Sequence, residues 1–247
     1  MPTYRDRAVV LRTHKLGESD RIITLLSRSR GKIRAVARGV RRTSSKFGAR
    51  LEPFSHIDAQ FAVGRNLDVV AQCETLHAFG RPLATNYPAY TAGQVMLETA
   101  DRLVTVEGEP AIGQYRLLVG ALWALGWRTS DGPRPPAMIL DSFLLRSLSL
   151  AGYAPSLSDC AHCGATGPLE WFSPESGGAV CVSCKPPGAA KPSGAAWGLM
   201  ISLLTGDWPT TRSVSPHTQA EVSGLVSAFV NWHLERGLRA LPMVDRR

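Results

Sequence analysis

Two pairs of closely spaced cysteines constrain the fold of this chain more than any other feature of its sequence. Cys160 and Cys163 form one Cys-x-x-Cys pair, and Cys181 and Cys184 form a second pair after 17 intervening residues. Each pair can turn two thiolates toward one metal ion at about 2.3 Å, and the segment between them has the glycines and prolines needed to fold back. The spacing predicts one zinc ion held by four cysteines, in an insertion at about residues 155–190.

Four thiolates complete a tetrahedral zinc site and leave no position for water, so we expect a structural and not a catalytic metal. Two disulfides are the competing interpretation, which the lack of a signal peptide disfavours. A thioredoxin-like redox motif is disfavoured because there are two pairs. His162 could replace one cysteine as a ligand, and the fifth cysteine, Cys73, is expected in a protein core.

Positive charge is concentrated in the first quarter of the chain. The formal net charge is +8, and residues 1–65 contain 15 of the 28 lysines and arginines but only 5 of the 20 acidic residues. The segment from Arg28 to Arg50 contains nine basic residues and no acidic residue. A polyanion is the natural partner of such a segment, and a solvated charged face is the alternative.

The basic region coincides with five short segments that are rich in β-branched residues, which is typical of strands. We expect these strands near residues 6–15, 19–27, 32–40, 51–63 and 67–76. Five consecutive strands predict that residues 1–79 form a five-stranded barrel of the oligonucleotide-binding (OB) type, with another small barrel topology as the alternative.

Alternation along the third expected strand separates its side chains into a cationic face and a core face. The cationic row could follow the phosphates of an extended DNA strand, and the loop after it would continue the track. Phe47, within that loop, either stacks on a base or pins the loop to the barrel. The residues expected to contact DNA come from the third strand and the loop after it, with Arg12 from the first strand and Arg21 from the second. They are Lys32, Arg34, Arg38, Arg41, Arg42, Lys46, Arg50, Arg12 and Arg21.

From residue 82 onward the hydrophobic period becomes helical. Apolar residues at steps of three and four indicate helices near residues 92–106, 111–127, 135–150, 195–204 and 218–238. We therefore expect an α+β multidomain protein in which residues 80–247 form a helical domain with the zinc insertion before its fourth helix. The longest apolar stretch, 117–127, is shorter than the roughly 18 to 20 residues that cross a bilayer, so we expect no membrane partner and a cytoplasmic location.

Motifs of common enzyme classes are missing. The sequence has no GxGxxG, GxxxxGK[ST], HExxH or GxSxG motif, and its six histidines show no catalytic spacing. Its acidic residues are scattered, which disfavours a two-metal nuclease. We therefore expect a protein that binds its partner without catalysing a reaction.

Several motifs, in order along the chain, resemble the family of the bacterial recombination mediator RecO. They include Gly17-Glu-Ser-Asp-Arg21, Gly31-Lys-Ile-Arg-Ala-Val-Ala-Arg-Gly39, Leu51-Glu-Pro-Phe54 and Phe172-Ser-Pro-Glu-Ser-Gly-Gly178. The resemblance implies an OB barrel, a helical domain and a zinc knot. It also implies binding of single- and double-stranded DNA, strand annealing, and work with RecR, and in some lineages RecF, to load RecA onto DNA coated by single-strand-binding protein. The implied location is the cytoplasm, in association with the nucleoid.

In the expected mechanism, DNA phosphates exchange their counterions for the basic side chains. If about six phosphates of a single strand are neutralised, log K should fall against log salt with a slope near −4. Charge reversal at Arg34 and Arg38 should then weaken DNA binding strongly. The alternative function is a zinc-ribbon RNA-binding or transcription accessory protein, and a metal-dependent nuclease is a third hypothesis.

Overall fold

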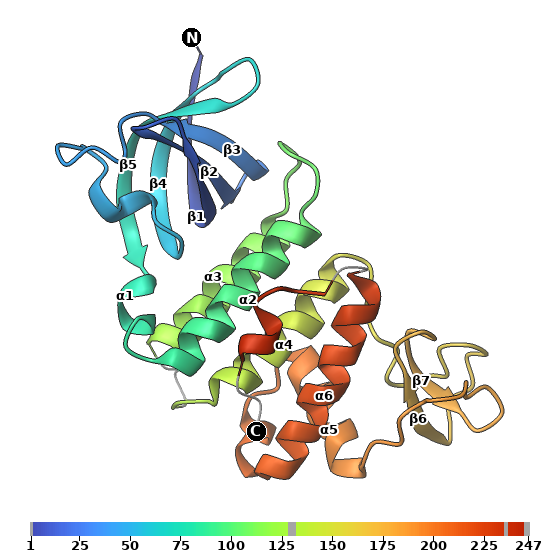
Figure 1. The fold of residues 1–247 in the computed structure, drawn as a ribbon. Helices are drawn as coiled ribbons and strands as arrows, with labels where there is room; N and C mark the ends of the chain where they lie inside the picture. Colours follow the sequence, from blue (N-terminus) through green and yellow to red (C-terminus); the bar gives the residue numbers. More distant parts are fainter. Residues whose placement is uncertain (1, 128–131, 235–236, 245–247) are drawn as a thin grey trace. The chain divides into compact units, whose positions relative to one another are not determined.

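The computed structural model describes residues 2–127, 132–234 and 237–244 (Figure 1). The chain divides into two compact units, Met1–Arg128 and Thr129–Arg247. Within the described residues, the first unit contains strands β1 to β5 and helices α1 to α3, and the second contains helices α4 to α6 and the hairpin β6–β7. The boundary expected after residue 79 therefore falls inside the first compact unit, and a separate domain that ends there stays a prediction.

The strands of the first unit form a closed barrel in the order β1-β2-β3-β5-β4. Only the contact between β3 and β5 is parallel. β1 pairs with β4 along its first half and with β2 along its second half, and the pairing with β2 shifts in register between Val10 and Arg12. The strands are β1 (Thr3–Leu16), β2 (Asp20–Ser27), β3 (Gly31–Ala37), β4 (Ser55–Ala62) and β5 (Asp68–Ala78).

All five expected strands are present, and their inward side chains fill the barrel. Ile23, Ile33, Ile57 and Phe61 are almost fully buried. Burial of side chains of this size stabilises a fold by about 1.5–3 kcal/mol each. Cys73 on β5 belongs to the same core cluster, which confirms the expectation for this residue.

The turn between β2 and β3 depends on Gly31. Its φ is +58°, a left-handed conformation that glycine adopts without strain. A Cβ atom at this position would lie 1.9 Å from the backbone oxygen of Glu109, in the connection between α2 and α3. The turn therefore requires glycine for its conformation and for the close approach of a second segment.

Three helices complete the first unit: α1 (Gly80–Leu83), α2 (Tyr87–Leu103) and α3 (Ile112–Gly126). The Asn86 side chain caps α2 by accepting a hydrogen bond from the Ala89 N–H. Phe54, just before β4, has a φ of 71° and is buried. Its ring lies so close to Gly93 on α2 that a Cβ there would be 2.8 Å from Phe54 Cε1. Barrel and α2 are thus packed tightly at this contact.

The second unit packs α4 (Pro136–Leu150) against α5 (Gly194–Thr205) and α6 (Pro216–His233). Ser193 and Ser215 cap the last two helices. The hairpin of β6 (Leu169–Ser173) and β7 (Gly178–Cys181) lies between α4 and α5 in the sequence. Residues 235 and 236, which belong to the helix expected at 218–238, lie outside the described residues. Within the described part of the chain, every helix is too short or too polar to cross a bilayer.

Candidate nucleic-acid interface and metal centre

The row of side chains on β3 alternates as expected. Arg34 is exposed and Lys32 is partly exposed, whereas Ile33 and Ala35 are buried. Arg38 is exposed as well, but it lies one residue beyond the end of β3, in a turn. The cationic row therefore consists of two residues on the strand and a third in the following segment, with Val36 interrupting it between Arg34 and Arg38.

Residues 38–54, here called the basic loop, connect β3 to β4 and complete the wall of the barrel. β3 pairs with β5 at two positions only, Ala35 with Asp68 and Val36 with Val69. Phe47 and Leu51 of the loop, 3% and 1% exposed, belong to the barrel core. Because its ring is buried, Phe47 pins the loop to the barrel, and the alternative in which it stacks on a base is wrong.

The base of the loop is held by hydrogen bonds to the turn between β1 and β2. The Gly39 N–H donates to Asp20 Oδ1 at 2.7 Å, and the Arg41 N–H donates to the Ser19 carbonyl at 3.0 Å. The Gly39 contact is the main reason that the pKa of Asp20 is lowered, with the Ser19 hydroxyl and the charges of Arg38 and Arg42 adding to it. The loop is thus fixed at its start as well as at its centre.

The outward side chains of the basic loop form no close ion pair with a described carboxylate, although the charges of Arg38 and Arg42 act on Asp20 from a greater distance. Arg41 donates to the carbonyls of Gly17 and Glu18, Lys46 donates to the Ala71 carbonyl at 2.8 Å, and Arg50 donates to the Lys46 carbonyl at 3.0 Å. These partners are backbone oxygens without net charge. Among the described residues, no carboxylate lies within ion-pair distance of the five loop cations Arg38, Arg41, Arg42, Lys46 and Arg50.

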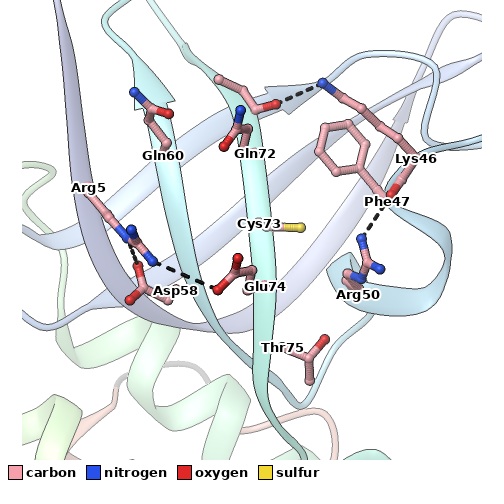
Figure 2. Close-up of a pocket in the computed structure, with 11 residues that line it drawn as sticks. Arg5, Lys46, Phe47, Arg50, Asp58, Gln60, Gln72, Cys73, Glu74 and Thr75 are labelled. Atoms are coloured by element: carbon pink, nitrogen blue, oxygen red, sulfur yellow. Dashed lines mark hydrogen bonds and ion pairs between the residues drawn. The ribbon is translucent and has the colours of Figure 1, made fainter.

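Two of these cations border a groove on the outside of the barrel (Figure 2). The groove has a volume of about 630 Å³ and lies between the basic loop and the outward side chains of β4 and β5. Lys46 and Arg50 lie on the side of the loop, and Arg5 lies on the opposite side, where its Nε donates to Asp58 at 2.7 Å.

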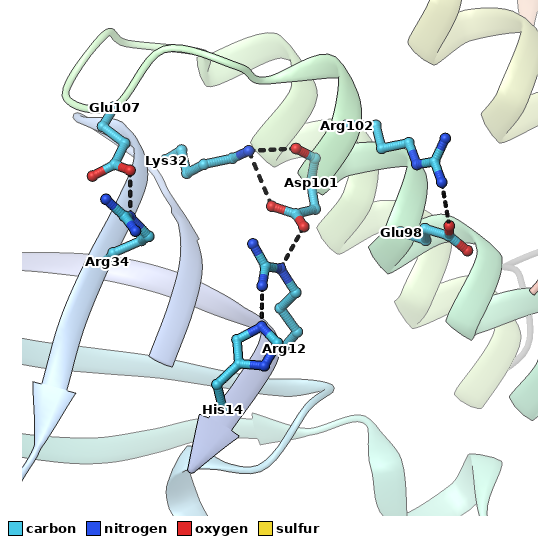
Figure 3. Close-up of polar contacts among 8 residues, drawn as sticks. All are labelled: Arg12, His14, Lys32, Arg34, Glu98, Asp101, Arg102 and Glu107. Carbon is cyan, nitrogen blue, oxygen red and sulfur yellow. Dashed lines mark hydrogen bonds and ion pairs between the residues drawn. The ribbon is translucent and has the colours of Figure 1, made fainter. Parts of the chain in front are cut away.

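The cations nearest to α2 are neutralised by acidic residues of the same unit (Figure 3). Asp101 Oδ2 accepts from Arg12 Nε at 2.6 Å, and Asp101 Oδ1 lies 3.0 Å from Lys32 Nζ. Arg34 forms an ion pair with Glu107, which follows α2. Asp101 and Glu107, here called the acidic latch, therefore cover Arg12, Lys32 and Arg34 with opposite charge.

Backbone contacts hold the acidic latch against β3. The Gly108 N–H donates to the Lys32 carbonyl at 3.0 Å, and Glu107 forms isolated bridges to Gly31 and Lys32. The ninth expected contact residue, Arg21, is also paired, with its Nη1 2.5 Å from Glu52 Oε1. Of the nine residues expected to contact DNA, four are thus engaged by carboxylates and five project from the basic loop.

A cluster of histidine and aromatic side chains lies between the barrel and α3. His56 Nδ1 is 3.0 Å from His77 Nδ1, and His56 Nε2 is 2.7 Å from the Tyr115 hydroxyl. Burial, followed by the nearby charges of His77 and Arg7, lowers the pKa of His56 to about 4. His56 is therefore neutral at physiological pH and acts as a buried hydrogen-bonding residue.

The four cysteines predicted to bind zinc come together in the second unit. Their Sγ atoms all lie within 4.8 Å of one another, and His162 is not part of the group. Zinc–sulfur bonds of about 2.3 Å in a tetrahedron place neighbouring sulfurs about 3.8 Å apart. Cys163 Sγ and Cys181 Sγ are 4.0 Å apart. Both the donor set and its spacing fit a metal ion.

Local backbone structure brings the two pairs together. In the first turn the Gly164 N–H donates to the Cys160 carbonyl at 2.8 Å, and in the second the Cys184 N–H donates to the Cys181 carbonyl at 3.1 Å. β7 ends at Cys181, so the hairpin carries the second pair back to the first. Hydrogen bonds from the backbone of Cys181, Cys163 and His162 lower the pKa of Cys160, whereas hydrogen bonds with the other three thiols raise the pKa of Cys184, so these four groups titrate as one cluster.

Comparisons with known proteins identify the family. The family model described as "Recombination protein O N terminal" matches residues 1–79, and "Recombination protein O C terminal" matches residues 84–242. The "DNA repair protein RecO" of Cutibacterium acnes is 61% identical over 246 residues, and that of Thermobifida fusca is 54% identical over 246 residues. The protein of that name from Streptomyces coelicolor is 56% identical over 252 residues. Each of the three comparisons covers 100% of both chains. The chain therefore belongs to the RecO family, and it is a DNA repair and recombination protein rather than an enzyme.

Proposed function

We propose that this protein binds single- and double-stranded DNA through the basic loop of its barrel and mediates recombination without catalysing a reaction. The observation that supports this most directly is the set of loop cations without a carboxylate partner among the described residues. Phosphates are the counterions that such a surface accepts, and arginine binds them with two parallel hydrogen bonds. The family's role in DNA repair makes DNA the relevant polyanion.

The barrel is proposed to be of the OB type. The strand order β1-β2-β3-β5-β4, with β3 and β5 parallel, supports this assignment. OB barrels bind nucleic acid on the face of strands 2 and 3 and with the loops that join strands 1 and 2 and strands 4 and 5. We propose that the loop after β3 extends this face. The basic loop lies at the junction of β3 and β5, where its charges can follow the sugar-phosphate backbone.

Arg12, Lys32, Arg34 and Arg21 are proposed to contribute a second part of the phosphate track. Arg21 and Arg34 pair with Glu52 and Glu107, which are 48% and 43% exposed, and ion pairs at the surface contribute only about 0–1 kcal/mol. DNA phosphates can therefore compete with these two carboxylates. Asp101, the partner of Arg12 and Lys32, is only 18% exposed, so its ion pairs are harder to displace. In free protein the basic loop provides the initial contact, and the β3 row becomes available as the latch is displaced.

We further propose that Cys160, Cys163, Cys181 and Cys184 bind one structural Zn²⁺. Bound zinc would cross-link the two cysteine turns and hold the hairpin β6–β7 in place. Four sulfur ligands complete its coordination, so zinc supports the fold of the second unit and takes no part in a reaction.

Within the cell, this DNA binding is proposed to serve strand annealing and, with RecR and RecF, the loading of RecA onto DNA coated by single-strand-binding protein. These partners come from the resemblance of the motifs around Gly17, Gly31 and Phe172 to the family. The cytoplasm, at the nucleoid, is the corresponding place of action.

A salt titration with charge-reversal variants tests the DNA interface. If the five loop cations each neutralise one phosphate of single-stranded DNA, log K should fall against log salt with a slope of about −3.5. This slope is slightly less steep than the value near −4 expected for six phosphates. Arg42→Glu should lower the affinity about tenfold at low salt. The matched control is Arg81→Glu, which changes the charge of an exposed residue on α1, outside the loop.

Fluorescence anisotropy with a labelled single strand provides the measurement. A protein that ignores DNA at low ionic strength would disprove the proposal. An equal loss of affinity in Arg81→Glu and in the loop variant would also contradict it, because net charge alone would then account for binding. Structured RNA as a competitor distinguishes the alternative RNA-binding function.

A further inference from the structure

The groove beside the basic loop has the size and the charge distribution of a subsite for one nucleotide. Its volume of about 630 Å³ falls within the roughly 300–1,000 Å³ of typical small-ligand pockets. It runs over the outer surface of β4 and β5, where Gln60 and Gln72 face each other in register. Figure 2 shows both amides between Arg5 on one side and Lys46 on the other.

The two sides of the groove differ in net charge. On the loop side, the Lys46 ammonium and the Arg50 guanidinium donate to backbone carbonyls and form no ion pair with any residue that the structure describes. On the opposite side, Arg5 donates to Asp58 at 2.7 Å and lies 3.9 Å from Glu74, so its charge is balanced. A phosphate is therefore attracted to the loop side, and an attached base would extend toward β4 and β5.

The strand side of the groove offers hydrogen-bond acceptors to such a base. The amide nitrogen of Gln60 donates to the Thr3 hydroxyl at 3.3 Å, which leaves the amide oxygen of Gln60 as an acceptor toward the groove. Gln72 is exposed, and the Glu74 carboxylate is 80% exposed. Acceptors of this kind recognise exocyclic amino groups: glutamine pairs with adenine, and carboxylates accept from the amino group of cytosine.

Aromatic stacking, the usual way to bind single-stranded bases without preference, is not available in this groove. Phe47 lines the groove, but its side chain is buried in the barrel core. Binding of a base here would therefore depend on hydrogen bonds at its edge, and hydrogen bonds distinguish among bases where stacking does not.

We propose that the groove holds one nucleotide of single-stranded DNA, with its phosphate on Lys46 and Arg50 and the amino group of a cytosine or adenine on Gln60, Gln72 and Glu74. This inference rests on the proposed DNA-binding function and adds base preference to it. The preference is for bases with an exocyclic amino group over thymine and uracil.

Oligo(dC) and oligo(dU) of equal length are suitable probes. Cytosine carries an exocyclic amino group where uracil carries a carbonyl oxygen, and the two bases have nearly the same size. Affinities are measured by anisotropy at slightly alkaline pH, where cytosine is unprotonated. The full chain should bind oligo(dC) about threefold to tenfold more tightly, as expected for one or two net hydrogen bonds. Gln72→Ala combined with Glu74→Ala should bring the ratio close to one, and because both residues are exposed, the fold should be unaffected.

The control variant, Arg41→Glu, lies on the basic loop outside the groove. It should weaken binding of both probes equally and keep their ratio. Equal affinity of the unmodified protein for the two probes, with the expected salt dependence, would overturn the groove inference and leave the DNA-binding function standing. A ratio that persists in Gln72→Ala with Glu74→Ala would also overturn it. A lack of binding to either probe would instead refute the DNA-binding function itself.

Discussion

Asp101 on α2 accepts a hydrogen bond from Arg12 on β1 at 2.6 Å, across 89 positions of the sequence. The same carboxylate lies 3.0 Å from Lys32 Nζ. One acidic side chain therefore neutralises two cations that the pattern of the barrel alone would assign to DNA. Together with the Arg34–Glu107 pair, it neutralises the cations of β1 and β3 that lie nearest to α2, whereas the basic-loop cations form no ion pair with a described carboxylate.

Removal of this carboxylate should strengthen DNA binding. In Asp101→Asn, Arg12 and Lys32 become available to phosphates, so the slope of log K against log salt should become more negative by up to about 1.4, which corresponds to two further phosphates. The free energy of unfolding should fall by about 1–3 kcal/mol, because the ion pairs of a largely buried carboxylate are lost. Salt titrations and urea unfolding measure the two effects.

Glu98→Gln is the matched control for this change, because Glu98 is also on α2 but pairs with Arg102 of the same helix at 3.1 Å. Both variants raise the net charge by one. If the slope changes equally in both, the acidic latch does not compete with DNA, and the proposal for the β3 row fails.

Loss of one cysteine should release the metal. We expect about one zinc per chain in the unmodified protein and much less in Cys163→Ser, with a lower melting temperature, since a structural zinc site contributes directly to folding energy. Elemental analysis and thermal unfolding are the measurements. Cys73→Ala is the control, because this cysteine lies in the barrel core and should leave the zinc content unchanged. Equal zinc content in the unmodified protein and Cys163→Ser would contradict the four-cysteine site.

Replacement by alanine of two glycines, Gly93 on α2 and Gly120 on α3, should change the free energy of unfolding in opposite directions. In Gly93→Ala, the new Cβ would lie 2.8 Å from Phe54 Cε1 and 3.3 Å from Leu83 Cδ1, so we expect destabilisation by about 1–3 kcal/mol. Gly120 on α3 has no atom within 4 Å of a built Cβ, and Gly120→Ala should stabilise the helix by up to about 1 kcal/mol. Urea unfolding of both variants and of the unmodified protein measures the two changes in free energy. A stable Gly93→Ala variant would show that the contact between Phe54 and α2 is loose.

Acid should destabilise the first unit through His56. The pKa of His56 is lowered to about 4 in the fold, while the unfolded chain titrates near 6.5, so the unfolded state binds more protons between these values. The stability from this residue is complete above about pH 6.5 and is lost as the pH falls toward about 4, by up to about 3 kcal/mol. Urea unfolding at several pH values measures this loss.

His56→Gln keeps a hydrogen-bonding group beside the Tyr115 hydroxyl and removes the titration. Its unfolding free energy should therefore depend less on pH over this interval than that of the unmodified protein. His14→Gln, which changes an exposed histidine on β1, should retain the original dependence. Identical pH profiles in all three proteins would show that protonation of His56 is not coupled to unfolding.

Local sequence patterns predicted the parts of the structure that local interactions determine. The cysteine cluster could be predicted because each pair is adjacent in sequence and a single turn directs both thiols to the same side. Alternation in β3 predicted an outward Arg34 and an inward Ile33. The hairpin β6–β7 was not anticipated, because strands of five and four residues are too short for a periodic pattern to show.

The acidic latch and the groove could not be predicted, because both depend on contacts between distant segments. Lys32 and Asp101 are 69 positions apart, and Arg34 and Glu107 are 73 positions apart. The net charge of residues 1–65 includes Lys32 and Arg34 but not their partners Asp101 and Glu107, which lie later in the sequence. The two cations therefore look unpaired in the sequence. Phe47 likewise has two plausible roles in an isolated loop, and only the packing of the barrel distinguishes them.

Anchoring of the basic loop by Phe47 and Leu51 has a thermodynamic consequence for any anion that binds there. A basic tail without such anchors loses conformational entropy when it is ordered by a ligand, by roughly 1–2 kcal/mol per residue for the backbone. In this protein much of that ordering has already occurred during folding, so the loop is preorganised. Single mutations of its outward basic residues can therefore change the affinity for an anion without disturbing the fold of the loop. Phe47 and Leu51, by contrast, must stay apolar to keep the loop fixed to the barrel.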